Sequence, residues 1–110
     1  MRNIAEFQIL GQVVRSVQVG KATKVTLAAN YQVKDGDQWV DDPHYNTVTV
    51  FNERTQKYIT DHIGIGDLVH ARGRMRQGSY EKNGETVYTN DLICDEFSRL
   101  SKSSGTRDEG

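Results

Sequence analysis

The fold is decided by residues 48–75, which read VTVFNERTQKYITDHIGIGDLVHARGRM. The two ends of this stretch alternate apolar and polar residues, which is the period of a strand with one buried face. The middle, residues 52–63, instead carries its apolar residues at helical spacing. Asn52 is a favourable N-cap, an acidic residue follows it, and Gly64 and Gly66 would end the helix. We therefore predict a helix over residues 52–63 between two strands.

Strand-like alternation recurs on both sides of this stretch. The residues expected to face inward are Phe7, Ile9, Gly11 and Val13, then Val25, Leu27 and Ala29, then Val48 and Val50, then Val69, Ala71, Gly73 and Met75. A fifth and less regular run extends from Thr86 to Leu100. Asn83-Gly84 predicts a two-residue hairpin turn because both residues tolerate positive φ. Asp35-Gly36-Asp37 predicts a second, longer hairpin loop.

Three strands, a helix and then a long hairpin follow the order of a known architecture. It is the five-stranded Greek-key barrel of the oligonucleotide/oligosaccharide-binding (OB) type, with its helix between the third and fourth strands. The strand glycines Gly11 and Gly73 suit a small barrel that must bend sharply. We therefore predict an all-β OB-fold barrel with one α-helix.

Length and composition indicate one domain over residues 1–100. The chain has 110 residues, 35% of them apolar, and a formal net charge of −1, enough for one modest core. Residues 101–110 contain no apolar side chain and predict a disordered tail. No apolar run is long enough for a membrane span or a signal peptide, so we expect a cytoplasmic protein. Cys94 is the single cysteine and is expected to pack as a small hydrophobic side chain.

The distribution of charge matters more than its near-neutral total, which by itself argues against a non-specific nucleic-acid binder. Residues 1–34 and 67–82 carry an excess of Lys and Arg, whereas residues 35–42 and 83–100 carry an excess of Asp and Glu. Phosphates sense charges only within about 8 to 10 Å in physiological salt. We therefore expect a basic strip that is offset by acidic segments elsewhere.

Aromatic and basic residues occupy the predicted outer face of the third and fourth strands. They are Tyr45, Thr47, Phe51, Arg72, Arg74, Arg76 and, if the fourth strand continues without a bulge, Tyr80. Aromatic rings stack on bases and arginine neutralises phosphates, so the set predicts binding of single-stranded nucleic acid. The alternative is that solvated strands often carry arginine, while Tyr45 or Phe51 packs under a loop or in a subunit interface.

From Phe7 to about Leu100 the chain resembles the bacterial single-stranded DNA-binding proteins. The resemblance rests on Val25-Thr-Leu-Ala-Ala-Asn30, Tyr45-Asn-Thr-Val-Thr-Val-Phe51, Gly66-Asp-Leu-Val-His-Ala-Arg-Gly-Arg-Met-Arg76, and Tyr80 with Asn83-Gly84 and Val87-Tyr-Thr89. It implies that Tyr45, Phe51 and Tyr80 stack on bases. It also implies a homo-oligomer, a dimer or tetramer, in which the first strand contributes to subunit pairing.

The chain departs from that family at three places. Where a further stacking aromatic is usual, at the end of the second strand, it has Val33, and Tyr31 with the same parity is a candidate substitute. Trp39 falls in the acidic loop expected between the second and third strands, which embraces DNA in the family, and a lid packed on its own barrel is the equal alternative. The C-terminus, residues 108–110, lacks the usual acidic and hydrophobic tip, which puts recruitment of replication and repair proteins by that route in question.

We predict a non-enzymatic protein that binds single-stranded DNA with little sequence preference in replication, recombination and repair. The predicted DNA-binding set is Tyr31, Lys34, Trp39, Tyr45, Thr47, Phe51, Arg72, Arg74, Arg76, Tyr80 and Lys82, with Lys24 as a further candidate. We expect no cofactor and no metal, because His44, His62 and His70 lack ligand spacing. The alternatives are an accessory barrel of the primosome type that acts mainly through protein contacts and, remotely, a metal-dependent nuclease on the same fold.

Overall fold

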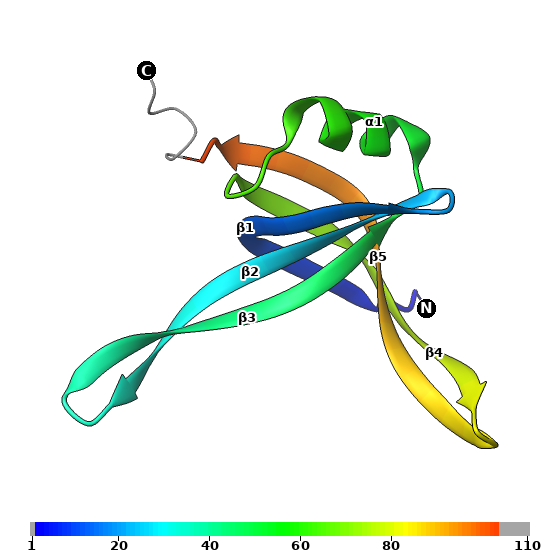
Figure 1. Cartoon of the computed structure of the whole chain (residues 1–110), viewed down its shortest axis with the longest axis horizontal. Coiled ribbons are helices and arrows are strands. Elements are labelled where there is room, and N and C mark those ends of the chain that lie inside the picture. Colours follow the sequence, from blue (N-terminus) through cyan, green and yellow to red (C-terminus); the bar gives the residue numbers. More distant parts are fainter. Residues whose placement is uncertain (1, 104–110) are drawn as a thin grey trace.

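All five predicted strands and the helix are present in the computed structural model, which describes residues 2–103 (Figure 1). In chain order the elements are β1 (Glu6–Val19), β2 (Ala22–Asp35), β3 (Gln38–Val50), α1 (Glu53–His62), β4 (Leu68–Lys82) and β5 (Glu85–Ser101). The strands close into a barrel in the order β1-β2-β3-β5-β4. Every neighbouring pair is antiparallel except β3 and β5, which pair parallel through Thr49–Ile93 and Val50–Cys94. This arrangement confirms the predicted OB-type barrel.

The core is the set of side chains that alternation places inside the barrel. It comprises Phe7, Ile9, Val13, Val25, Leu27, Val48, Val50, Ile59, Val69, Ala71, Cys94 and Phe97. Ile59 comes from α1, which lies over one end of the barrel (Figure 1). The prediction that Cys94 packs as a small hydrophobic residue is confirmed. Burial raises the pKa of its thiol to about 11, so the thiol remains protonated at neutral pH.

The helix begins and ends where its capping residues predict. The Asn52 side chain accepts a hydrogen bond from the Thr55 backbone N–H at 3.0 Å, and the Ile63 N–H donates to the Ile59 carbonyl. The Gln56 amide donates to the Lys21 carbonyl at 2.8 Å and so ties α1 to the β1–β2 turn. Within residues 2–103, no helix is long and apolar enough to cross a membrane.

Two glycines allow strands to approach closely inside the barrel wall. A Cβ on Gly11 would lie 2.5 Å from the Ala28 carbonyl oxygen, and a Cβ on Gly73 would overlap the Ile93 carbonyl oxygen. The ladder of β4 with β5 shifts register beside Gly73, where Asp95 is the extra residue on β5. Glycine is therefore required at both positions by backbone contact, which gives the predicted bending a physical basis.

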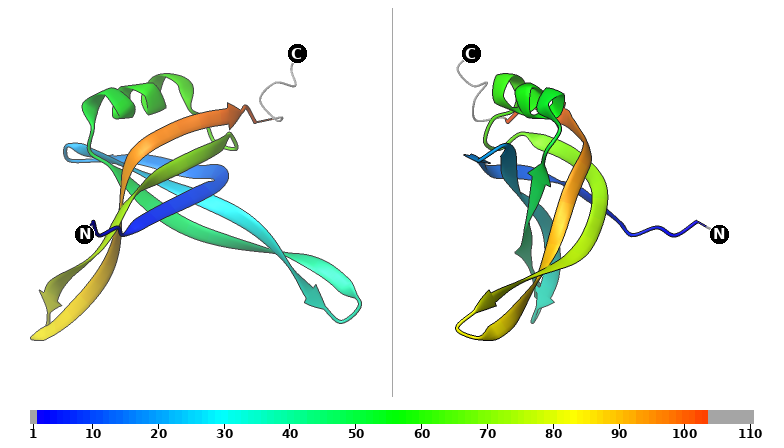
Figure 2. Two further views of the ribbon diagram at one scale, coloured as in Figure 1. Left: turned by 180° about the vertical axis from the view of Figure 1, so that it is seen from behind. Right: turned by 90° about the vertical axis from the view of Figure 1, so that its right-hand side faces the viewer.

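Two hairpin ribbons, β2–β3 and β4–β5, extend from the barrel on the side opposite α1 (Figures 1 and 2). The expectation of a long acidic loop at residues 35–42 is wrong. Asp35 pairs with Gln38, and only Gly36-Asp37 form the turn. Gly36 has a φ of 69°, and a glycine with positive φ at the first turn position permits so tight a reversal. The acidic residues therefore lie on a ribbon, not in a loop.

At the tip of the other ribbon the predicted turn is confirmed, because Asn83 and Gly84 have φ values of 52° and 79°. Met75 lies on the inner side that parity predicted, but it is 43% exposed and is not part of the core. β4 reaches the edge of the barrel here, because its ladder with β1 ends at Arg74. The Met75 backbone N–H donates to the Ala5 carbonyl at 3.1 Å, in the segment that precedes β1.

The carboxylate of Asp67 fixes the chain just beyond β5. Asp67 is buried and accepts hydrogen bonds from the Gly64 and Ser103 backbone N–H groups, each at 2.8 Å. The predicted disordered tail began at Ser101, which the structure assigns to β5. Residues 102 and 103 of the predicted tail are also described, and Ser103 is the residue held by Asp67. The rest of that prediction, residues 104–110, lies outside the described residues.

Candidate nucleic-acid interface

One face of the β2–β3 ribbon carries aromatic and basic side chains together. Tyr45 pairs with Ala28 and Trp39 with Lys34, and cross-strand partners share a face. Thr47 lies on the same face, with its hydroxyl 2.9 Å from that of a threonine on β2. Trp39 is exposed, so it does not pack as a lid, and the Lys34 ammonium lies 6.0 Å from its ring centroid.

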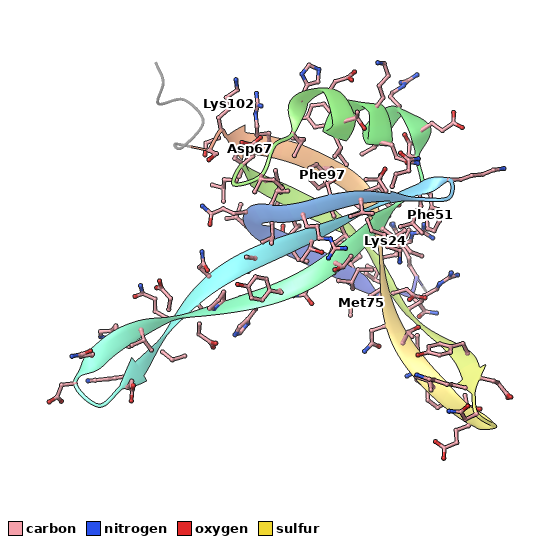
Figure 3. The ribbon with its side chains drawn as sticks, viewed as in Figure 1. Lys24, Phe51, Asp67, Met75, Phe97 and Lys102 are labelled. Carbon is pink, nitrogen blue, oxygen red and sulfur yellow. The ribbon has the colours of Figure 1, made fainter. Side chains whose placement is uncertain are left out.

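Phe51 extends this face toward α1. It follows the last residue of β3 at the same parity as Tyr45, and its carbonyl accepts a hydrogen bond from the Gln56 amide at 3.2 Å. Lys24 pairs with Thr49 and so lies on the same outer side (Figure 3). Aromatic rings and ammonium groups thus follow one another from the hairpin tip to the helix.

The outer face of β4 carries the three predicted arginines and ends in a tyrosine. The ladder with β5 is regular from Gly73 to Lys82, so Arg74, Arg76, Tyr80 and Lys82 share one face. The condition on which Tyr80 was included, an unbulged strand, is therefore met. Tyr45, Phe51 and Tyr80 are 61%, 55% and 51% exposed, respectively, and so are open to stacking.

The expected separation of basic and acidic segments is wrong on β4. Each outward arginine has a carboxylate of β5 beside it. The pairs are Arg72–Glu96 at 3.0 Å, Arg74–Asp95 at 3.3 Å and Arg76–Asp91 at 3.8 Å. The extra residue at Asp95 helps to form the first two pairs. It leaves two successive acidic residues, Asp95 and Glu96, exposed between the buried residues Cys94 and Phe97. The basic strip is therefore matched pairwise by acids.

Tyr31 lies on the opposite face of the β2–β3 ribbon from Tyr45. It pairs with Asp42 and shares the face of Val33, as its parity predicted. Its ring lies 4.5 Å, between centroids, from the ring of His44. Tyr31 and His44 line a pocket of about 540 Å³ with His70. The structure therefore does not bring Tyr31 together with Tyr45, Phe51 and Trp39.

Tyr88 is an exposed aromatic residue that the predicted set omits. It pairs with Ser79 on β4 and is 65% exposed, on the face of the β4–β5 ribbon opposite Tyr80. The two-residue turn at Asn83-Gly84 fixes the register, so this position could have been derived from the sequence. Tyr88 serves below as a matched comparison for the stacking residues.

The thiol of Cys94, the single cysteine, is not activated as a nucleophile. Cys94 is held protonated by burial, which raises its pKa to about 11. In the part of the chain that the structure describes, no three His, Cys, Asp or Glu side chains gather as a metal site. What the surface offers is exposed rings for stacking and cations for phosphate contact.

Comparison with known proteins finds one family and one fold. A model of the single-strand binding protein family matches residues 4–100. The mitochondrial single-stranded DNA-binding protein of S. cerevisiae superposes with a TM-score of 0.73 at 19% identity, over 92% of this chain and 99% of that chain. A Plasmodium falciparum homologue solved with single-stranded DNA gives 0.73 at 12%, over 92% and 98%. A small single-stranded DNA-binding protein from Streptomyces coelicolor gives 0.61 at 19%, over 89% and 95%. No curated protein matches the chain significantly.

Proposed function

Because the chain belongs to the single-strand binding protein family, it binds single-stranded DNA, and we propose that it does so with little sequence preference by base stacking. The observation that carries this proposal is the set of three exposed rings, Tyr45, Phe51 and Tyr80, at the outer surface of the sheet. Every base has a π-face, so stacking tolerates any sequence and contributes about 1 to 3 kcal/mol per base.

Phosphate contacts supply the second part of the proposed mechanism. Lys34 and Lys24 lie on the face of Tyr45 and Phe51, and Lys82 lies beside Tyr80 at the tip of the other ribbon. Neutralising backbone phosphates releases condensed counterions, so affinity should fall as the salt concentration rises. Arg72, Arg74 and Arg76 contribute once DNA displaces their carboxylate partners.

We place this activity in the protection of single-stranded DNA during replication, recombination and repair, and in the cytoplasm where such DNA is exposed. Proteins of this family are DNA-binding proteins without enzymatic activity, which sets aside the nuclease alternative. The fold supports the binding role because hydrogen-bonded strands hold Tyr45 and Tyr80 at the surface.

We also propose that the protein acts as a homo-oligomer, a dimer or tetramer, paired through β1. Apolar side chains are exposed along this strand. They are Leu10, Val14, Val17 and Val19. Exposed apolar groups that recur along one strand are typical of a subunit contact. Light scattering coupled to gel filtration tests this proposal, and a mass equal to one chain at micromolar concentration would contradict it.

A second candidate function is that of an accessory barrel that touches DNA weakly and acts mainly through protein contacts. The three arginine–carboxylate pairs favour it, because arginines that already have partners offer less attraction to phosphate. The two candidates differ in measured affinity for DNA at physiological salt. Micromolar or tighter binding supports the first candidate, and loss of binding above low salt supports the second.

The deciding experiment is a titration of a fluorescently labelled oligothymidine by anisotropy at several salt concentrations. The proposed function predicts binding that weakens linearly in log affinity against log salt, and similar affinity for mixed-sequence oligonucleotides. Lys34→Gln should weaken binding, whereas Lys57→Gln is the matched control because it removes the same charge from α1, where Lys57 pairs with Asp61. Absence of binding at low salt would contradict the proposal.

A further inference from the structure

Asp91 occupies the space between a cation and a stacking ring on the β4–β5 ribbon. Its Oδ2 atom lies 3.8 Å from the Arg76 Nε, and the Thr89 hydroxyl donates to its Oδ1 at 3.3 Å. The carboxylate lies over Gly78, where an added Cβ would be 2.8 Å from Oδ2. Gly78 separates Arg76 from Tyr80 on the same face of β4. A carboxylate therefore lies between the arginine and the tyrosine.

Among the three arginine–carboxylate pairs, this one is the most easily exchanged. From the barrel outward the pairs lengthen from 3.0 to 3.3 to 3.8 Å, and the exposure of the arginine rises from 46% to 64% to 69%. Long, exposed ion pairs are strongly screened and contribute little net stability. Arg76 can thus change partners at small cost, whereas Arg72 is held more closely by Glu96.

We propose that Asp91 sets the affinity for DNA by acting as an internal competitor, which holds Arg76 until a backbone phosphate displaces it. The inference rests on the proposed function, because it assigns a role within the same binding surface. A carboxylate and a phosphate offer arginine the same kind of paired oxygen acceptors. The exchange replaces one anion with another and leaves the Asp91 charge facing the bound strand.

Two consequences distinguish this role from a merely structural ion pair. Asp91 already neutralises Arg76 in the protein without DNA. When Arg76 then binds a phosphate, fewer salt ions are released than for an unpaired arginine. Binding should therefore be weaker, and less sensitive to salt, than the number of cations on the surface suggests. Removing the competing charge should reverse both effects together.

The test compares the whole protein with its Asp91→Asn variant in oligothymidine titrations at several salt concentrations. Asparagine keeps the size of the side chain and can still accept from the Thr89 hydroxyl. We expect binding to tighten about two- to fivefold, as the small net contribution of exposed pairs implies, and the log–log salt slope to steepen by up to about 0.7. Asp61→Asn is the control, because Asp61 pairs with Lys57 on α1 away from the ribbons, and it should leave both quantities unchanged.

A double-mutant cycle with Arg76→Gln decides between exchange and simple repulsion. If Asp91 acts through Arg76, Asp91→Asn should have little effect in the Arg76→Gln background. Equal tightening in both backgrounds would overturn the proposal, because it would show repulsion between Asp91 and DNA alone. Unchanged affinity and slope in the single variant would also overturn it, while wild-type binding in the same titration would keep the proposed function intact. If the wild-type protein did not bind oligothymidine, both this proposal and the proposed function would be contradicted.

Discussion

The two ribbons that leave the barrel offer different side-chain chemistry to the same ligand, single-stranded DNA. On β2–β3, the exposed face carries Tyr45 and Trp39 with Lys34 beside them. Two acids of this ribbon contact polar groups of the same ribbon, Asp41 contacting Gln32 and Asp42 contacting His44. On β4–β5, the exposed face carries a row of arginines, each beside a carboxylate, with Tyr80 beyond them. The first ribbon is organised for stacking and the second for exchange of ionic partners.

This difference separates the two contributions to binding. Stacking energy is insensitive to salt, whereas phosphate contacts weaken as salt rises. Substitutions of the aromatic residues on β2–β3 should therefore change affinity at every salt concentration by a similar factor. Substitutions of the arginines on β4–β5 should change how affinity depends on salt.

The largest effects should come from the stacking residues on β3 and just beyond it. Tyr45→Ala and Phe51→Ala should each cost about 1 to 3 kcal/mol of binding free energy. The salt slope should stay unchanged, because neither substitution removes a charge. Anisotropy titrations measure both quantities, and thermal melts should be nearly unaffected because both rings are exposed. Tyr88→Ala is the control, and an equal loss there would place the DNA on the opposite face of β4–β5.

A second effect concerns the point where the β4–β5 ribbon joins the barrel, at Cys94. Burial raises the pKa of this thiol from 9.0 to about 11, so the folded state retains the proton more tightly than the unfolded chain. Its contribution to stability is complete below pH 9 and is lost as pH rises from 9 toward 11, on the order of 2 kcal/mol. Urea unfolding at pH 9 and at pH 11 should show that the free energy of unfolding falls between the two values. The fall should be smaller in the Cys94→Ala variant than in the wild-type protein. The same fall in both proteins would contradict the assignment.

Smaller changes are expected along the arginine row. Arg76→Gln should weaken binding about two- to fivefold and make the salt slope shallower, because the exposed pair is easily exchanged. Arg72→Gln should have less effect, since Arg72 is less exposed and lies closer to its carboxylate. Titrations at several salt concentrations test this gradient. The reverse order would indicate that DNA passes over the barrel wall instead of the ribbon.

The smallest effect on affinity is expected at Trp39, near the tip of β2–β3. Trp39→Phe keeps an aromatic ring, so binding should weaken less than threefold. The chain has one tryptophan, so the change in tryptophan fluorescence on adding oligothymidine should disappear in this variant. A wild-type protein whose tryptophan fluorescence does not respond to DNA would show that this tip stays clear of the strand.

Most of the fold could be predicted because its signals are local. Asn52 fixes the start of α1, Asn83-Gly84 fixes one turn, and alternation identifies core residues such as Val48 and Val50. Met75 shows the limit of alternation, since parity gives the side of a strand but not the point where the strand leaves the barrel. The length of β2–β3 was missed because acidic residues around Gly36 resemble a loop in the sequence.

The candidate site could be predicted only as a set of side chains on strand faces. The exposure of Tyr45, Phe51 and Tyr80 followed from parity alone. Asp91 beside Arg76 follows from the register that the Asn83-Gly84 turn sets. The carboxylates beside Arg72 and Arg74 could not be foreseen, because their position depends on the extra residue at Asp95. A displacement of one residue there moves an acid from one side of the sheet to the other.

The parallel contact between β3 and β5 is also the place where the barrel should open first. Thr49–Ile93 and Val50–Cys94 are its two residue pairs, whereas β4 and β5 pair along nearly their whole length. A short seam between segments far apart in sequence forms late in folding and opens at low cost in the native state. Its amide protons should therefore exchange with solvent sooner than those of the β1–β4 ladder. Local opening of this seam would move Phe51, which directly follows Val50 in the chain, without disturbing Tyr80.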